Sequence, residues 1–267
     1  MCQSTNNIII PTLRYPVRSM EQLNMTTWSM VVDCPEVAAK AVPGQFVHLL
    51  PDGNYTLRRP ISICEINRSA GTLRLVFEVR GEGTETLSHL RAGDMVNLLG
   101  SLGHGFTLLE QKQPVILIGG GIGTPPMLPL AQYYGEQATV ICGFRNAGAA
   151  ILQQDFAKAG AQTVLCTDDG SAGHHGLVTQ PLAELINERK PAMLYACGPM
   201  PMLRAIANMA KAQGIPCEVS LEERMGCGVG ACLVCACNIY LDDGSVHAGH
   251  VCKDGPVFDA ERVVWNG

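Results

Sequence analysis

The stretch VILIGGGIGTPP at residues 115–126 decides the fold. It opens with a continuous apolar run, which is typical of a strand buried on both faces of a parallel sheet. The glycines allow the backbone to approach a ligand closely, and Thr124 and Pro125 suit the cap and first turn of a helix. Free N–H groups and the positive end of the helix dipole would then face a pyrophosphate. The nucleotide-binding candidates here are Gly119, Gly120, Gly121, Ile122, Gly123 and Thr124.

Strand-like and helix-like runs alternate after this stretch. They are ATVICGF at 138–144, QQDFAKAG at 153–160, TVLCT at 163–167, LAELINERK at 182–190, MLYACG at 193–198 and MLRAIANMAKAQG at 202–214. Strands that alternate with helices predict a doubly wound α/β unit with a mostly parallel sheet. We assign residues 111–216 to this dinucleotide-binding domain.

Two other strand ends fall at the edge of the predicted sheet where ligands of open α/β sheets bind. Cys197, Gly198 and Pro199 follow one strand, although a turn whose cysteine is simply buried would look the same. Asp168 and Asp169 end another strand, where a solvated acidic turn is the alternative. Because two carboxylates would repel the extra phosphate of NADP, the sequence favours NAD.

Residues 1–110 precede this unit and consist of short β-rich runs separated by Gly and Pro. The runs are QFVHLL at 45–50, ISICEI at 61–66, LRLVFEV at 73–79 and MVNLLG at 95–100. Such spacing predicts an antiparallel β-barrel or sandwich.

An arginine-rich motif opens one of these barrel runs. It reads Arg58, Arg59, Pro60, Ile61 and Ser62, with Gly83 and Thr84 further along the chain. A guanidinium can pair with a flavin pyrophosphate, and the Ser62 hydroxyl can reach a flavin ring. An ordinary basic strand edge is the alternative interpretation.

Residues 217–267 form a third segment, in which Gly and Cys are frequent. Its C-x4-C-x2-C pattern, with a fourth Cys after sixteen intervening residues, has the plant-type ferredoxin spacing for a 2Fe-2S cluster. The four candidate ligands are Cys227, Cys232, Cys235 and Cys252. Glycines between the first three would let backbone N–H groups approach the sulfides, and a strand with a turn at 242–244 would return the fourth. The segment is too short to hold a core unaided, so something besides packing must fix it.

Other uses of these cysteines are open at this point. A structural zinc site usually needs two short C-x2-C or C-x2-H halves, and the second half here supplies only Cys252. A disulfide is disfavoured in a reducing compartment. Cys237 is interpreted as a small buried strand residue. The other cysteines are interpreted as inert core or surface residues: Cys2, Cys34, Cys64, Cys142, Cys166 and Cys217.

Charge and composition exclude several classes of protein. The formal net charge is -5 and charged residues make up 16% of the chain, so neither a nucleic-acid surface nor an acidic tail is indicated. The first ten residues lack the basic and apolar regions of a secretory leader. The longest apolar stretch, 115–131, is broken by four Gly and three Pro, which argues against a membrane span. We expect a soluble cytoplasmic protein.

The three segments together resemble the ferredoxin-NAD(P) reductase superfamily and, within it, the electron-transfer subunits of class B dihydroorotate dehydrogenase. The resemblance covers nearly the full length. It is carried, in order, by LRRPISI, GEGT, LIGGGIGTPP, TDDGS, CGP, ERMGCGVGACLVCAC and VCKDGPVF. It implies three domains: a FAD-binding β-barrel over 1–110, an NAD-binding α/β domain over 111–216 and a small C-terminal 2Fe-2S domain over 217–267.

The resemblance also implies the roles of individual residues. Ser62 and Cys197 would act at the reacting ring, and the cluster would be held by the four cysteines of the spacing above. The implied FAD contacts are Arg59, Pro60, Ile61, Ser62, Val76, Phe77, Glu78, Gly83 and Thr84. One departure is visible, because the family tends to carry an aromatic-Arg pair where this chain has Phe77 and Glu78. That puts a charge contact from Glu78 to FAD in doubt and leaves a backbone contact possible.

A partner follows from the same resemblance. It implies an FMN-containing catalytic subunit that oxidises dihydroorotate in pyrimidine biosynthesis, in a complex of two subunits of each kind. Single electrons would then pass through the cluster to FAD and leave as hydride on NAD. A reductase subunit of the same fold that serves ferredoxin or an oxygenase is the main alternative. A zinc-stabilised binding module and a redox sensor are alternatives from other classes.

Overall fold

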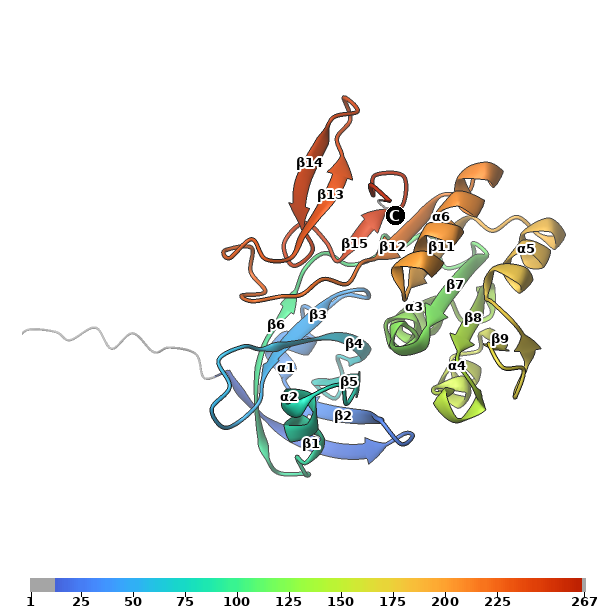
Figure 1. The fold of residues 1–267 in the computed structure, drawn as a ribbon. Helices are drawn as coiled ribbons and strands as arrows, with labels where there is room; N and C mark the ends of the chain where they lie inside the picture. Colours follow the sequence, from blue (N-terminus) through green and yellow to red (C-terminus); the bar gives the residue numbers. More distant parts are fainter. Residues whose placement is uncertain (1–12, 266–267) are drawn as a thin grey trace, which may run out of the picture.

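The structure is a computed structural model that describes residues 13–265. Figure 1 shows a barrel, an α/β unit beside it and a C-terminal segment that runs along both. The barrel is closed, with strand order β1-β2-β5-β4-β3-β6. Its strands are β1 (Arg14–Gln22), β2 (Thr27–Asp33), β3 (Phe46–Leu50), β4 (Arg59–Asn67), β5 (Thr72–Glu78) and β6 (Met95–Leu102). Two short helices, α1 (Pro35–Ala38) and α2 (Glu82–Ser88), accompany it. The antiparallel barrel predicted from the β-rich runs is confirmed.

The α/β unit contains a seven-stranded sheet in the order β10-β9-β8-β7-β11-β12-β15. The strands are β7 (Val115–Gly120), β8 (Ala138–Phe144), β9 (Gln162–Thr167), β10 (His174–His175), β11 (Met193–Cys197), β12 (Cys217–Ser220) and β15 (Val257–Asp259). All adjacent pairs are parallel except β12 with β15. The chain order reverses direction between β7 and β11, and ligands of such sheets bind at this switch point.

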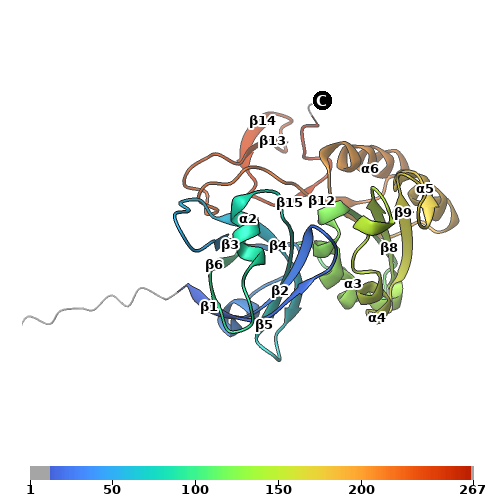
Figure 2. The ribbon, with the colours of Figure 1, turned by 60° about the horizontal axis from the view of Figure 1, so that its bottom comes forward.

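Helices cover both faces of this sheet, as Figure 2 shows. They are α3 (Leu128–Tyr134), α4 (Gln153–Lys158), α5 (Thr179–Glu188) and α6 (Met200–Gln213). One core cluster joins α3 and α4 to the sheet and another joins α5 and α6 to its other face. The predicted doubly wound arrangement is therefore confirmed. None of the helices in the described part of the chain is long and apolar enough to cross a membrane.

The turn after β7 differs from the sequence prediction. Two 3-10 turns, Gly121–Gly123 and Pro125–Met127, separate β7 from α3. Thr124 lies between them with helical backbone angles, so it does not cap a helix. Its hydroxyl is buried, has no hydrogen-bond partner within residues 13–265, and would be 2.8 Å from a Cβ atom on Gly119. The capping role predicted for Thr124 is wrong because the chain coils tightly before the α-helix begins.

The C-terminal segment is tied to the α/β sheet at two points. β12 extends the sheet beyond β11, and β15 returns from the end of the chain to pair with β12. Between them lie the cysteine-rich loop and a two-stranded hairpin, β13 (Ala236–Tyr240) with β14 (Val246–His250). The domain boundaries predicted at 110/111 and 216/217 stay predictions. Cys2 lies outside the described residues.

One ion pair links the barrel to the α/β unit. The Arg74 guanidinium on β5 lies 2.7 Å from the carboxylate of Asp155 on α4 and donates to Ser29 of the barrel. The Arg74 side chain is only 14% exposed. Because a buried charge needs its partner, this pair fixes the orientation of α4 against the barrel.

Replacement of Arg74 should therefore destabilise the protein far more than loss of a surface ion pair. For Arg74→Met we expect the free energy of unfolding in urea to fall by about 3 kcal/mol, because Asp155 is left without its cation. Arg14→Met is the matched control, because the Arg14–Asp52 pair is about half exposed and should be worth less than about 1 kcal/mol. Equal losses of unfolding free energy in the two variants would show that the Arg74–Asp155 pair stabilises the protein no more than an exposed ion pair does.

Candidate functional site

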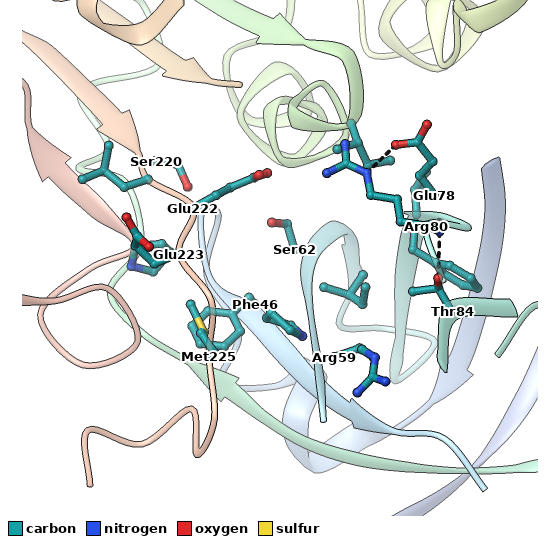
Figure 3. A pocket seen from close by; sticks show the side chains of 17 residues that line it. Phe46, Arg59, Ser62, Glu78, Arg80, Thr84, Ser220, Glu222, Glu223 and Met225 are labelled. Carbon is teal, nitrogen blue, oxygen red and sulfur yellow. Dashed lines mark hydrogen bonds and ion pairs between the residues drawn. The ribbon is translucent and has the colours of Figure 1, made fainter. Parts of the chain in front are cut away.

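A cavity of about 230 Å³ lies between the barrel and the segment that follows β12, and we call it the barrel cavity. Eight of the nine predicted flavin-contacting residues line it: Arg59, Pro60, Ile61, Ser62, Val76, Phe77, Glu78 and Thr84. Figure 3 shows Ser62 between the strands of the barrel on one side and Ser220, Glu222, Glu223 and Met225 on the other. Strands β4 and β5 are neighbours, so residues separated by about fifteen positions in the sequence line one wall.

Gly83 does not line the cavity but supports it. A Cβ atom added to Gly83 would lie 2.4–2.6 Å from the Arg59 guanidinium, so the guanidinium rests directly on the first turn of α2. Arg59 also donates to the Leu57 carbonyl at 2.6 Å and lies over the Tyr55 ring. The Thr84 hydroxyl accepts a hydrogen bond from the Arg80 backbone N–H at 2.9 Å. These contacts hold a fixed cation and a polar helix start beside the cavity.

A second cavity of about 1000 Å³ lies at the switch point of the sheet, and we call it the sheet cavity. The predicted dinucleotide-binding residues on its wall are Gly120, Gly121, Ile122, Gly123, Asp168, Gly198 and Pro199. Gly121 has a φ of +54°, and a Cβ atom there would meet nothing within 4 Å. Gly123 is packed, since its Cβ would lie 2.4 Å from the Cys197 carbonyl oxygen. The loop therefore combines one glycine open to a ligand with one required by packing.

Four predicted residues lie away from the wall of the sheet cavity. They are Gly119, Thr124, Asp169 and Cys197. Asp169 is exposed, and its carboxylate accepts from the Ser171 N–H and hydroxyl, which lowers its pKa. Cys197 is buried, and burial, followed by the Glu222 charge, raises the pKa of its thiol to about 12. Cys197 therefore stays a protonated thiol at neutral pH.

The two cavities share four lining residues, so they adjoin. These are Glu78, Arg80, Ile122 and Glu222. The Arg80 guanidinium lies 2.7 Å from the Glu78 carboxylate. Burial raises the pKa of Glu222, and the positive charge of Arg80 opposes that rise. Groups bound in the two cavities could therefore meet at a small, charged junction.

Sequence reasoning missed one wall of the barrel cavity. The missed residues belong chiefly to the end of β12 and the segment after it: Ser220, Leu221, Glu222, Glu223 and Met225. The signal was available, because this segment follows the carboxyl end of a strand in an open α/β sheet. Arg80 was also missed, although it lies on the same side of its extended segment as Glu78, two residues away.

The same segment leads directly into the loop at 226–235, which carries Cys227, Cys232 and Cys235 and which we call the cysteine loop. Met225 lines the barrel cavity and Cys227 lies two residues further on. Backbone N–H groups link these cysteines in two pairs: Cys227 and Cys232 each place an N–H 3.4 Å from the other's sulfur, and the Cys252 N–H lies 3.4 Å from the Cys235 sulfur. In residues 13–265 no three His, Cys, Asp or Glu side chains are arranged to hold a single metal ion.

Backbone N–H groups point at the sulfur atoms of this loop. Those of Val229, Ala231 and Cys232 lie 3.2–3.4 Å from the Cys227 sulfur. These donors, led by Val229, lower the pKa of Cys227 to about 6. The Gly230 N–H lies 3.2 Å from the Cys252 sulfur. Donors of this kind stabilise thiolates and the sulfur atoms of a bound cluster, so these residues fit an iron-sulfur group.

The remaining described cysteines behave as core residues. Cys34, Cys64, Cys142, Cys166 and Cys217 are buried, which agrees with the inert role that the sequence indicated. Burial raises the pKa of Cys34 to about 12 and that of Cys166 to about 11. Cys237 lies on β13, half-buried, and burial raises its pKa to about 11.

Comparison with known proteins agrees with this geometry. Residues 222–264 match the family model of the iron-sulfur cluster binding domain of dihydroorotate dehydrogenase B. The chain is 44% identical to the dihydroorotate dehydrogenase B (NAD(+)) electron transfer subunit of Desulforamulus reducens, over 90% of this chain and 93% of the relative. It is 40% identical to the same subunit of Geobacillus thermodenitrificans, over 94% of this chain and 98% of that one.

Solved structures show the same fold. The NADH-dependent reduced ferredoxin-NADP oxidoreductase, associated with flavin-based electron bifurcation, superimposes with a TM-score of 0.83 at 29% identity and covers 94% of this chain. That match covers 90% of the oxidoreductase chain. The FAD/NAD binding domain of a Vibrio cholerae nitric oxide dioxygenase has a TM-score of 0.65 at 23% identity, over 77% of this chain and 97% of that domain. With relatives this similar over nearly its whole length, the chain belongs to the family of dihydroorotate dehydrogenase B (NAD(+)) electron transfer subunits.

Proposed function

We propose that this subunit binds FAD in the barrel cavity, NAD in the sheet cavity and a 2Fe-2S cluster on its cysteine loop, and that it links dihydroorotate oxidation to NAD reduction. One observation carries the proposal. The barrel cavity adjoins the sheet cavity on one side, and its wall runs on into the cysteine loop on the other. These adjoining positions support a continuous path from a hydride carrier through a flavin to a one-electron group.

The barrel residues suit a flavin. Arg59, held on α2 by its contact with Gly83, would pair with the pyrophosphate, and Thr84 would lie near the phosphates. Ser62 projects its hydroxyl into the cavity, where it would approach the ring (Figure 3). Val76 and Phe77 supply the apolar wall that an isoalloxazine ring needs. When bound, FAD would supply the chemistry that joins two-electron hydride transfer to one-electron transfer.

The sheet cavity suits a dinucleotide without a 2′-phosphate. The open backbone of Gly121 and the nearby Gly198 and Pro199 would receive the pyrophosphate and the nicotinamide half. Asp168 places a carboxylate on the cavity wall, which would repel an extra phosphate. The preference for NAD is thus supported by Asp168, while Asp169 is occupied by Ser171.

The nicotinamide end would reach the junction formed by Ile122, Glu78, Arg80 and Glu222. Cys197 is a buried, protonated thiol near Glu222 of this junction. We propose that Ser62 orients the flavin by hydrogen bonding, and that Cys197, which lines neither cavity, supports the residues of the junction by packing behind them. Neither side chain needs to exchange a proton for hydride transfer to occur.

The cysteine loop supplies the outlet to a partner. We propose that Cys227, Cys232, Cys235 and Cys252 hold a 2Fe-2S cluster, on the strength of their spacing and of the backbone contacts that bring them together in two pairs. Val229, Leu233 and Val234 beside these ligands are 54–60% exposed. Apolar side chains gathered around a redox group favour a protein-protein contact, here with an FMN-containing catalytic subunit. The resemblance supports two subunits of each kind.

We place this function in the cytoplasm. The eleven described cysteines are free thiols, which suits a reducing compartment.

Co-expression with the catalytic subunit tests the proposal as a whole. The purified complex should contain FAD, iron and acid-labile sulfide, and dihydroorotate should drive reduction of NAD, followed at 340 nm. The main alternative, a reductase for ferredoxin or an oxygenase, would give NADH oxidation with those acceptors and none with orotate. A complex that carries both flavins and the cluster but does not respond to dihydroorotate would refute the pathway assignment.

The ligand set makes a separate prediction. Serine replacement of Cys227, Cys232, Cys235 or Cys252 should each lower the iron content at least about tenfold, because even loss of an outer-shell partner weakens metal binding 10–100-fold. FAD content should persist, since the barrel cavity is distinct from the loop. Cys237→Ser is the matched control and should keep full iron. Iron and sulfide analysis with EPR spectroscopy measures the outcome, and iron loss in Cys237→Ser would require a revised ligand set.

The contact between Gly83 and Arg59 predicts a specific effect on flavin binding. Gly83→Ala places a methyl group where the guanidinium lies, so we expect about tenfold weaker FAD binding, the effect of a local overpacking of 1–3 kcal/mol. Gly81→Ala is the matched control, because a Cβ atom there meets nothing within 4 Å. Flavin titration of the deflavinated complex distinguishes them. If Gly83→Ala and Gly81→Ala bind FAD with equal affinity, Arg59 is not part of the FAD-binding site.

A further inference from the structure

A fully buried histidine lies where the barrel meets the cysteine loop. His48 is the middle residue of β3 and its exposed fraction is 0%. The flanking Val47 and Leu49 belong to the barrel core, whereas Phe46 belongs to the core around Cys235 and Cys252. Because side chains alternate along a strand, His48 projects with Phe46 out of the barrel and beneath the C-terminal segment. Figure 1 shows that segment passing beside β3.

The imidazole touches the cysteine loop directly. A Cβ atom on Gly228 would lie 2.5 Å from Nδ1 of His48 and 3.1 Å from Cε1. Gly228 also has a φ of +74°, which favours glycine. The ring therefore occupies the space that a side chain at position 228 would need, one residue from the ligand Cys227.

Neither nitrogen of this ring has a hydrogen-bond partner among the described residues. The backbones of Cys227 and Arg58 lie close enough to influence the ring, but neither forms a hydrogen bond with it. A buried polar group without a partner costs about 1–3 kcal/mol, so its presence needs a reason. An apolar residue would satisfy packing on this otherwise apolar face at no such cost.

The strand is held in place at His48 by a neighbouring arginine. Arg58 donates to the His48 carbonyl at 3.1 Å and to the Asn97 side chain at 2.9 Å, which fixes the backbone at this position. An imidazole carries at least one ring N–H donor in either protonation state, so a group bound at the cysteine loop could accept a hydrogen bond from it.

We propose that His48 is a positioning residue of the cysteine loop, and that its N–H donates a hydrogen bond to a sulfur atom of the group bound there. This inference rests on the proposed function, because the acceptor is the proposed cluster. Reduction adds one negative charge to an iron-sulfur cluster, and a hydrogen bond to its sulfur atoms stabilises that charge. His48 therefore raises the reduction potential of the cluster and couples the cysteine loop to the strand beside the barrel cavity.

Two variants at this position separate the hydrogen bond from packing. His48→Phe fills a similar volume without an N–H, whereas His48→Gln retains an amide N–H donor. In the complex with the catalytic subunit, the potential is measured by redox titration with EPR, and iron and sulfide are quantified. His48→Phe should shift the one-electron equilibrium about tenfold toward the oxidised cluster, equivalent to 59 mV at n = 1. His48→Gln should retain nearly the wild-type potential. His89→Phe, at the exposed end of α2, should change nothing.

Each outcome decides the inference. An unchanged potential in His48→Phe, or equal shifts in the Phe and Gln variants, would overturn it and leave the proposed function intact. If His48→Phe fails to take up iron, the Gln variant decides: full iron and a wild-type potential support the hydrogen bond, and any other result refutes it. Absence of iron and sulfide from the wild-type complex would overturn both this inference and the proposed cluster.

Discussion

The arrangement depends on one short piece of backbone, Ser220–Met225, which leaves the α/β sheet at the end of β12. The Leu221 N–H donates to the Pro256 carbonyl at 2.8 Å, so the segment is held by the returning chain as it leaves the sheet. Along its length it forms a wall of the barrel cavity and contributes Glu222 to both cavities. It then becomes the cysteine loop. The distance between the proposed flavin site and the proposed cluster site is therefore set by a few residues of chain and not by the docking of independent domains.

Tight backbone packing explains much of the glycine content around these sites. Gly123 lies against the Cys197 carbonyl and Gly83 against the Arg59 guanidinium, where any side chain would force the two apart. Gly228 lies against His48 in the same way. In each case a glycine allows one element that bears chemistry to touch another. The sites are thus pre-organised by contacts that exist without a ligand, which reduces the cost of binding.

Local patterns allowed most of the fold to be predicted. The apolar run at 115–118 and the strand-helix alternation after it reflect periodicity alone, and the spacing of the four cysteines is a local property of one loop. What the sequence could not show depends on long-range contacts. The pairing of β12 with β15 joins residues about forty positions apart, and the role of Glu222 depends on two cavities meeting. The cap predicted at Thr124 was wrong for a local reason, because two consecutive 3-10 turns lie between β7 and α3.

The same long-range contacts answer why so short a C-terminal segment can hold its shape. Its sequence is too small to build a core, yet Cys235, Val251 and Cys252 are buried within the core that α5 and α6 form on the sheet. The Val251 N–H donates to the Cys235 carbonyl at 2.9 Å, which ties the third and fourth cysteines together through the backbone. Pairing of β15 with β12 then closes the loop at its far end. The α/β unit thus supplies the core that the segment lacks.

The four cysteines differ in how firmly they are held. Cys235 and Cys252 are anchored in the core of the α/β unit, whereas Cys227 and Cys232 lie in the more exposed part of the loop. A group bound across both pairs would be rigid on one side and accessible on the other, which is the asymmetry that electron exchange with a second protein requires.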